Sequence, residues 1–304
     1  MANWKGKTRG GLLGYQIFVF LIRYAGLRAA YGLLLFVAFY FVFFSPSASR
    51  SIYSFFRKRL GKGALVSIFG IYKTYWAFGQ ALIDRTAVLA GFSDKFTYDF
   101  DGEQHIHEIA EAGNGGLLLS IHGGNWSMAG SILDENVGHH ARINIVMLEA
   151  EHKKIQDFLN KVQVKQAANI IGIGQDFSHI IAMGTALRQG ELLCMHGDRF
   201  LPGAETITVD FLGATAHFPA GPFQLISRMK VPYSFVFAFK EKSSHYHFSA
   251  TPIQQASATP QVVAQQFAQE VETKIRKYPY QWYNFYDFWA TPSSNKTNLQ
   301  ASNE

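Results

Sequence analysis

The sequence predicts an α/β domain with a mixed, mainly parallel sheet flanked by helices, preceded by an N-terminal membrane helix. Short apolar runs typical of buried strands alternate with segments whose apolar residues recur at helical spacing. A chain of 304 residues with 48% hydrophobic residues can bury one large core and a small accessory segment. An uncharged apolar window of helix length lies near the N-terminus. Strands separated by helices form a sheet that helices cover on both sides.

The apolar window spans residues 29–49 and contains no charged side chain. Its 21 residues reach the ~20 that a membrane helix needs. The bulky aromatic residues in this run are typical of an anchor rather than of a cleaved signal peptide. Residues 17–22 form a second, interfacial piece. Because basic residues flank the window on both sides, orientation stays open, as does the choice between a single span, a monotopic helix pair and a buried helix of a soluble core.

The basic residues are concentrated at the start of the chain. Of the 28 Lys and Arg residues, 11 precede Asp84, the first acidic residue. A basic segment attracts nucleic acid or an anionic lipid surface. The apolar window among these charges favours the lipid surface, so we expect a membrane partner and no nucleic acid.

A domain division follows from these patterns. We assign residues 1–62 to a membrane anchor and basic interfacial segment, 63–292 to a catalytic domain, and 293–304 to a polar tail expected to be disordered. The single cysteine, Cys194, excludes an internal disulfide and a cysteine-based zinc site. Its apolar neighbours predict a small buried residue rather than a nucleophile.

Strands and helices are expected in regular alternation. Strands are expected at 117–121, 143–147, 169–173, 192–196, 207–211 and 231–239, and helices at 128–133, 155–162, 177–187, 222–229 and from Thr259 to Pro279. Asp176 is a candidate N-cap and Gly190 the stop of the third helix. The last helix starts at Thr259-Pro260 and presents an apolar face formed by Val263, Phe267, Val271 and Ile275.

The sequence Leu-Leu-Leu-Ser-Ile-His-Gly-Gly-Asn-Trp at 117–126 presents His122 at the end of a strand, before a glycine turn. Open α/β sheets bind ligands at such ends. An imidazole takes up a proton near neutral pH, and glycines let a substrate approach the backbone. Backbone amides of Gly123, Gly124 and Asn125 at a helix start can hold an oxyanion. His122 is a candidate general base; a structural histidine at a strand end is the alternative.

A second strand end carries His-Gly-Asp-Arg at 196–199. Because parallel strand ends converge on one edge of a sheet, Asp198 is a candidate to orient an imidazole or to bind a cation. Arg199 offers a planar donor fork for phosphate or carboxylate. A structural Asp–Arg pair is the alternative.

The order of these segments resembles the lipid A secondary acyltransferase family, the lauroyl and myristoyl transferases of the lysophospholipid acyltransferase superfamily. The resemblance extends from Trp4 to Trp289. It rests on the anchor and on four segments, namely Ser-Ile-His-Gly-Gly-Asn-Trp at 120–126, Met-His-Gly-Asp-Arg at 195–199, Phe-Leu-Gly at 211–213 with Phe-Pro-Ala-Gly-Pro at 218–222, and an aromatic end at 280–289 without the basic pair often found there.

This resemblance implies acyl transfer without a covalent enzyme intermediate and without a metal or redox cofactor. His122 would deprotonate a hydroxyl of a membrane lipid or glycolipid, with a lipid A-like acceptor favoured, and Arg199 would bind a phosphate. The implied donor is acyl carrier protein or coenzyme A, and the implied location is the bacterial inner membrane with the catalytic domain facing the cytoplasm. Candidates to line an apolar tunnel for the acyl chain are Phe211, Leu212, Phe218 and Phe223, although core packing is the expected role for most of them.

The chain departs from the family at the acidic position of the catalytic motif. The family pattern is histidine, four residues, then Asp or Glu, and this chain has Ser127 there. Serine brings no charge, so Asp198, or else Glu149 or Glu151, would have to orient His122. The alternative is a catalytically weakened, lipid-binding relative. The predicted substrate-binding residues are Gly123, Gly124, Asn125, Ser127, Glu149 and Arg199.

The chain has 11 histidines, some in pairs such as His105 and His107, His139 and His140, or His245 and His247. Alternating histidines on a strand share a face and can bind zinc. No acidic residue accompanies them at ligand spacing in the sequence, so we expect surface histidines and no metal. A metal-dependent hydrolase is the remaining alternative.

Overall fold

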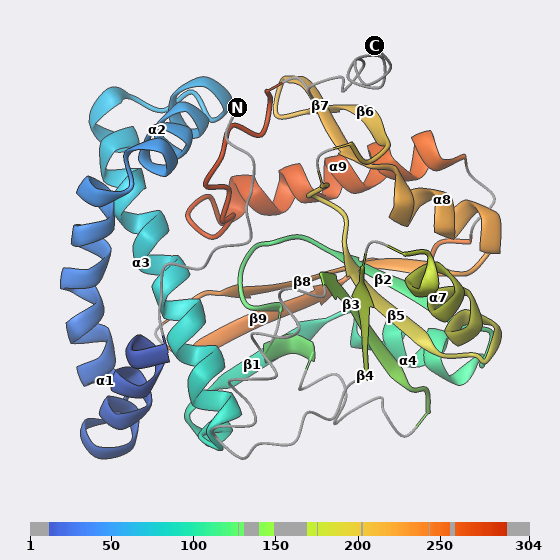
Figure 1. Cartoon of the computed structure of the whole chain (residues 1–304), viewed down its shortest axis with the longest axis horizontal. Helices are drawn as coiled ribbons and strands as arrows, with labels where there is room; N and C mark the ends of the chain where they lie inside the picture. Colours follow the sequence, from blue (N-terminus) through green and yellow to red (C-terminus); the bar gives the residue numbers. More distant parts are fainter. Residues whose placement is uncertain are drawn as a thin grey trace, which may run out of the picture.

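The computed structural model describes residues 12–126, 128–130, 140–148, 169–174, 176–201, 203–242, 244–255 and 259–290. Figure 1 shows one sheet with helices around it and a helical N-terminal segment along one side. The helix expected at 128–133 lies partly outside the described residues. The helix expected at 155–162 and the tail at 293–304 lie wholly outside them.

Seven strands of the described chain form one sheet in the order β1-β9-β8-β2-β5-β3-β4. Their bounds are β1 (Thr97–Asp101), β2 (Gly116–Ser120), β3 (Ile143–Leu148), β4 (Asn169–Ile173), β5 (Leu192–His196), β8 (Tyr233–Lys240) and β9 (His245–Ala250). The five neighbouring strands β8, β2, β5, β3 and β4 run parallel to one another, and β9 is antiparallel to β8. The predicted mixed, mainly parallel sheet is confirmed.

The strand expected at 207–211 exists but lies outside this sheet. It is β6 (Thr206–Phe211), which pairs only with β7 (Ala214–Pro219) as an antiparallel hairpin among the described residues. Leu212 and Gly213 at its tip both have positive φ, which places two left-handed residues in the turn.

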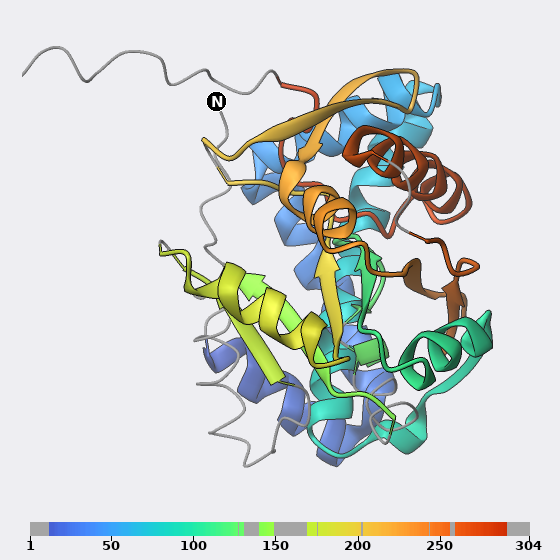
Figure 2. The ribbon, with the colours of Figure 1, turned by 90° about the vertical axis from the view of Figure 1, so that its right-hand side faces the viewer.

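Helices cover both faces of the sheet. Successive side chains of β2 point to opposite faces and pack against different helices. Leu117 and Leu119 belong to the large core cluster that includes Phe267 of α9, whereas Leu118 packs with Ile106 and Ile109 of α4. The helices concerned are α4 (Glu103–Glu111), α7 (Ser178–Arg188), α8 (Ala220–Met229) and α9 (Pro260–Lys277). Figure 2 shows α4 and α9 apart from each other, with strands between them.

Three of the predicted helix boundaries, two on α7 and one on α9, can be compared with the structure. Helix α7 starts at Ser178, and the N-cap position is Phe177 rather than the predicted Asp176, whose carboxylate instead accepts a bond from the Ser178 hydroxyl. Gly190, with φ of 80°, follows its end as predicted. Helix α9 begins after Thr259, whose side chain accepts from the Val262 amide, as expected for a cap.

The N-terminal segment consists of α1 (Leu12–Phe44), α2 (Pro46–Ser54), a π-helical turn η1 (Phe55–Arg59) and α3 (Ala64–Leu89), while a short 3₁₀ turn η2 (Ser93–Lys95) leads to β1. Gly26 has non-helical backbone angles and breaks α1 between the two apolar pieces predicted from the sequence. Within the described residues, Ile17–Phe44 is one helix long and apolar enough to cross a membrane by length and composition. Only 17% of its most apolar window is buried.

Helix α3 was not predicted, and it joins α1 to the sheet. It packs along α1 (Figure 1), and Tyr75 of α3 lies in the same core cluster as Phe56 of η1 and Phe235 of β8. The division at residues 62 and 63 stays a prediction.

Replacing Phe267 by Ala is expected to lower the free energy of unfolding by about 3–5 kcal/mol, because it leaves a cavity in a core that cannot fully collapse. Phe267 contacts the rings of Phe218, Phe223 and Phe235. Val262→Ala on the same helix is the matched control, since Val262 is 46% exposed. Thermal unfolding of the detergent-solubilised protein measures both; equal losses would contradict this account of the core.

Candidate active site

The register of β2 and β5 places His122 beside Asp198. Ser120 of β2 is paired with His196 of β5, and each candidate residue lies two positions beyond its strand's paired residue. The amide of Gly197 also donates to the carbonyl of Ser120 at 2.9 Å, which keeps the two strand ends together. The carboxyl ends of β2 and β5 therefore place a histidine and a carboxylate next to each other.

Asp198 holds both the backbone and the ring of His122. Its Oδ1 lies 2.7 Å from His122 Nδ1, and both carboxylate oxygens accept from the His122 amide at 3.1 Å. Trp282 Nε1 donates to Oδ2 at 3.4 Å. With 1% of its surface exposed, Asp198 is buried among donors. The orientation of the imidazole is thus fixed by a carboxylate from the neighbouring strand.

The charges around Asp198 decide which nitrogen of His122 carries the proton. Burial alone would raise the pKa of Asp198, but the charges of His122 and Arg199 and the His122 hydrogen bond hold the pKa well below its usual value. The ionised carboxylate can only accept hydrogen bonds, so Nδ1 of His122 is the donor. Nε2 of the neutral ring is then the basic nitrogen.

His196 forms one wall of the site. Its ring centroid lies 4.2 Å from that of His122 and 4.7 Å from that of Trp126. Burial and the nearby charges of His122 and Arg199 lower the pKa of His196 well below its usual value, so it is neutral at pH 7. A neutral ring beside His122 adds no repulsion when His122 takes up a proton.

The glycine turn contacts protein backbone, contrary to the prediction that it leaves amides open to an oxyanion. The amides of Gly123, Gly124 and Asn125 donate to the carbonyls of Ile121, Gln281 and Ala238, each at 2.8 Å. A Cβ at Gly124, where φ is 59°, would lie 1.8 Å from the Ala238 carbonyl oxygen. The glycines are needed because the turn is pressed against β8 and the C-terminal segment.

Asn125 also differs from its predicted substrate-binding role. It is 3% exposed, and its side-chain amide donates to the Ala81 carbonyl and to the Tyr246 hydroxyl, both at 3.2 Å. Its side chain points into the protein because a buried polar group needs partners that this network supplies.

The network behind Asn125 is centred on Asp84, which is fully buried in α3. Its carboxylate accepts from Lys240 Nζ at 2.6 Å and from the hydroxyls of Tyr31 and Tyr246. Burial raises the pKa of Asp84, and the charge of Lys240 opposes that shift. The network connects α1, α3, β8 and β9 to the catalytic turn.

Arg199 lies next to the site, and part of its donor fork is already used. Its Nη2 donates to the Tyr283 carbonyl at 2.6 Å, and the guanidinium lies 5.9 Å from the Tyr286 ring centroid. The Tyr283 amide in turn donates to the His122 carbonyl at 3.1 Å. A guanidinium has five N–H donors, so Arg199 can hold an anion while it keeps this contact.

Two cavities border the catalytic turn. One, of about 70 Å³, is lined mainly by apolar side chains and includes Trp126, His196 and Cys194 in its wall. The other, of about 260 Å³, is more polar and is lined by Gly124, Tyr283 and other residues, among them Gln80, Lys240 and Lys242. The predicted tunnel residues lie elsewhere, as buried members of the core: Phe211, Leu212, Phe218 and Phe223.

The remaining predicted residues, Ser127, Glu149 and Glu151, lie outside the described part of the chain. Of the three candidate carboxylates, the structure places Asp198 on His122. Its assignment as the replacement for the missing acid at position 127 rests on this contact alone.

Comparison with known proteins identifies the family. The model of the bacterial lipid A biosynthesis acyltransferases matches residues 71–291. The chain belongs to the bacterial lipid A biosynthesis acyltransferase family. A phosphatidylinositol mannoside acyltransferase from Mycolicibacterium smegmatis is 22% identical over 196 residues, which are 63% of this chain and 62% of that protein. The chain thus spans less than two thirds of the length of this relative.

The histidine pairs are separate from the candidate site around His122 and Asp198. His105 and His107 lie on helix α4, whereas His245 and His247 alternate along β9. Two groups in the described chain could hold a metal ion, Asp99, Asp101 and His247, and His107, Glu111 and His140. Neither contains His122 or Asp198. Their acidic residues are Asp99 and Asp101 on β1, which lies beside β9, and Glu111, one turn after His107 on α4.

The sequence did not reveal the residues that support the candidate site. Trp282, Asp84 and Lys240 come from distant segments, and no local spacing connects them to His122. One indication was present, since Trp282 lies in the aromatic end that resembles the family's closing motif. No sequence pattern pointed to Tyr246, which lies between His245 and His247.

Gly124→Ala is expected to destabilise the protein more than Gly213→Ala. Both positions have positive φ, which costs alanine about 1–2 kcal/mol. Only at Gly124 would the new methyl group meet a carbonyl oxygen, whereas nothing lies within 4 Å at Gly213. The overlap should add about 1–3 kcal/mol, the usual cost of overpacking. Thermal unfolding compares the two; equal stability would refute the close contact of the turn with β8.

Proposed function

We propose that this protein transfers a fatty acyl chain from an acyl thioester to a hydroxyl group of a membrane lipid or glycolipid. The observation that carries the proposal is the contact between His122 and the buried Asp198 at the edge of the sheet. The family name supports a lipid A-like acceptor, and the name of the mycobacterial relative supports a glycolipid.

In the proposed reaction His122 acts as general base. Nε2 takes the proton of the acceptor hydroxyl while its oxygen attacks the thioester carbonyl, and Asp198 stabilises the imidazolium that forms. The C–S bond then breaks, and the imidazolium returns the proton to the departing thiolate. The products are an ester and a free thiol, and no covalent acyl-enzyme intermediate forms at any stage.

The proposed donor is acyl carrier protein or coenzyme A, both of which carry a phosphopantetheine arm. Arg199 is proposed to bind a phosphate of this arm or of the acceptor, and its position beside Asp198 supports the assignment. The exposed basic residues Arg57 and Lys58 on η1 suit an acidic carrier protein. The polar lining of the larger cavity fits a sugar or phosphate headgroup.

The narrow apolar cavity is proposed to receive the acyl chain. It adjoins the base, since His196 lies both in its wall and against His122. Leu118, Phe248 and Gly130 form further parts of the wall. Apolar side chains beside a few polar groups are typical of sites for lipid-like ligands.

Membrane association is proposed to place this site beside the bilayer. Helix α1 exposes large apolar side chains, including Phe36 and Phe43, and α3 exposes Leu65 and Phe69 near its start. Exposed large apolar side chains on two neighbouring helices favour contact with lipid. We assign the protein to the bacterial inner membrane with the catalytic domain facing the cytoplasm, where the thioester donors are made.

His122→Gln and Asp198→Asn are each expected to lower kcat/KM of acyl transfer by about 10²–10⁴-fold, because one removes the base and the other its orienting carboxylate. The measurement uses the purified protein in lipid nanodiscs with an acyl carrier protein thioester and extracted lipid acceptors, followed by mass spectrometry of the lipids. His105→Gln and Asp210→Asn serve as matched controls, since both residues lie outside the site. Unchanged transfer in the folded His122 variant would refute the proposed base.

Gly130→Leu is expected to shorten the preferred acyl chain by a few carbons, because the larger side chain occupies the narrow cavity. A Cβ at Gly130 meets only Ile145 at 3.5 Å, so the backbone can accept the change. Gly221→Leu is the control, on an exposed helical position with nothing within 4 Å. Competition between donors of different chain length measures the preference. The same preference in both variants would place the chain elsewhere.

A further inference from the structure

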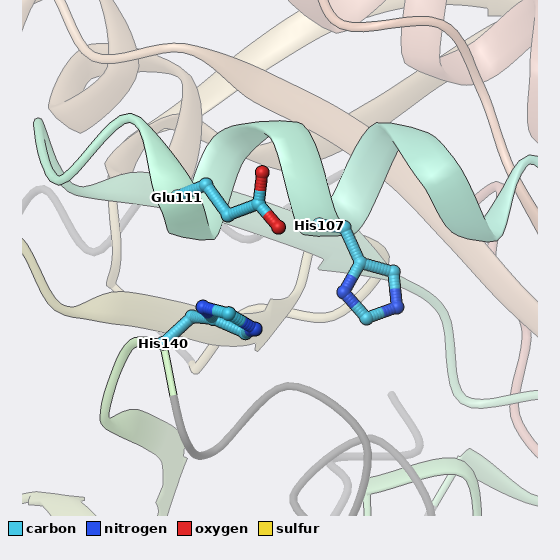
Figure 3. Close-up of side chains that lie close together, drawn as sticks. All are labelled: His107, Glu111 and His140. Atoms are coloured by element: carbon cyan, nitrogen blue, oxygen red, sulfur yellow. The ribbon is translucent and has the colours of Figure 1, made fainter.

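Three side chains of types that bind metals lie near the amino ends of β2 and β3, at the opposite end of these strands from His122. His107 and Glu111 are one turn apart on α4, and His140 lies shortly before β3. The nearest ligand atoms of these three residues all lie within 4.8 Å of one another. Figure 3 shows the His107 and Glu111 side chains leaving α4 on the side where His140 lies.

We propose that His107, Glu111 and His140 form a zinc site that fastens α4 to the segment leading into β3. Two imidazoles and one carboxylate are a ligand set that Zn²⁺ prefers, with water completing a tetrahedron. Ligand atoms around such an ion are about 3.4 Å apart, as bonds of about 2.0–2.1 Å require. Glu111 and His140 are exposed, so their side chains can rotate to close the remaining distance.

A further carboxylate is placed to orient one ligand. Glu103 lies one turn before His107 on α4, with its Oε1 3.8 Å from His107 Nε2. A carboxylate on one ring nitrogen is the usual partner of a histidine that binds metal through the other. In the proposed site Nδ1 of His107 binds the ion and Nε2–H faces Glu103.

The other cluster of the described chain is less suited to a metal ion because its groups satisfy one another. His247 Nδ1 lies 3.0 Å from Asp99 and its Nε2 3.6 Å from Asp101. Asp99 also contacts His245 Nε2 at 3.1 Å. The hydrogen bond from His247 lowers the pKa of Asp99, as expected of an established ion pair. A metal would have to displace these contacts.

The proposed zinc site is structural, since it lies at the opposite end of the strands from His122 and Asp198. Glu111 precedes the amino end of β2 and His140 that of β3, whereas His122 and Asp198 follow the carboxyl ends of β2 and β5. Zinc bound there would link a helix on one face of the sheet to the start of an inner strand. It would raise thermal stability without taking part in acyl transfer.

The test uses the full-length protein in detergent, with any affinity tag removed and metals stripped by a chelator. Isothermal titration with Zn²⁺ is expected to show binding at this site, with a rise of several degrees in Tm. His107→Ala and His140→Ala should each weaken binding by at least about 10-fold, the loss found even for outer partners of metal ligands. Co²⁺ should give the visible absorption of a tetrahedral ion, and His107→Ala should abolish it.

Two controls identify the site. His105→Ala removes a neighbouring histidine on α4 that pairs with Glu108, and it should bind zinc like the parent. Asp99→Asn disables the other cluster and should leave binding unchanged. The proposal is overturned if the stripped protein binds no Zn²⁺, if the His107 and His140 variants bind like the parent, or if Asp99→Asn alone abolishes binding.

Discussion

The hydrogen-bonded pair of His122 and Asp198 is the interaction on which the rest of the site depends. A buried carboxylate is costly unless donors and positive charge surround it, and this requirement brings three segments together. The strand end after β2 supplies the imidazole and its amide, the strand end after β5 supplies the carboxylate, and the C-terminal segment supplies Trp282. Asp198 is therefore both the orienter of the base and the point where these segments are joined.

The turn that carries His122 also contacts a second network of buried side chains, which is centred on Asp84. Asp84 and Lys240 form a close ion pair, the Tyr246 hydroxyl donates to Asp84, and the side-chain amide of Asn125 donates to the Tyr246 hydroxyl. Breaking such a pair on one side leaves an uncompensated buried charge, which is strongly destabilising. Since Tyr31 of α1 is also part of this network, the apolar N-terminal helix and the catalytic turn belong to one structure.

The fold class was predictable because strand and helix periodicities are local. The run ending in His122 and the strand ending in His196 were placed correctly, and parallel strand ends share an edge, so the meeting of His122 with Asp198 could be anticipated. Pairings between distant segments could not. The Asp84 network unites residues more than 150 positions apart, and the amides of the glycine turn were expected to be free because no sequence pattern reveals the Ala238 carbonyl beside Gly124. Likewise, α4 has only nine residues, too short for its helical period to stand out from the alternating histidines within it.

The proton position on His122 tests the central claim most directly. Nitrogen-15 NMR of histidine-labelled protein in nanodiscs distinguishes a protonated from an unprotonated ring nitrogen, and His122→Gln assigns the resonance. The account predicts that the neutral ring carries its proton on Nδ1, with a downfield proton shift from the bond to Asp198, and that Nε2 is unprotonated. A neutral ring protonated at Nε2 would contradict it, because that nitrogen could not then accept a proton from an alcohol.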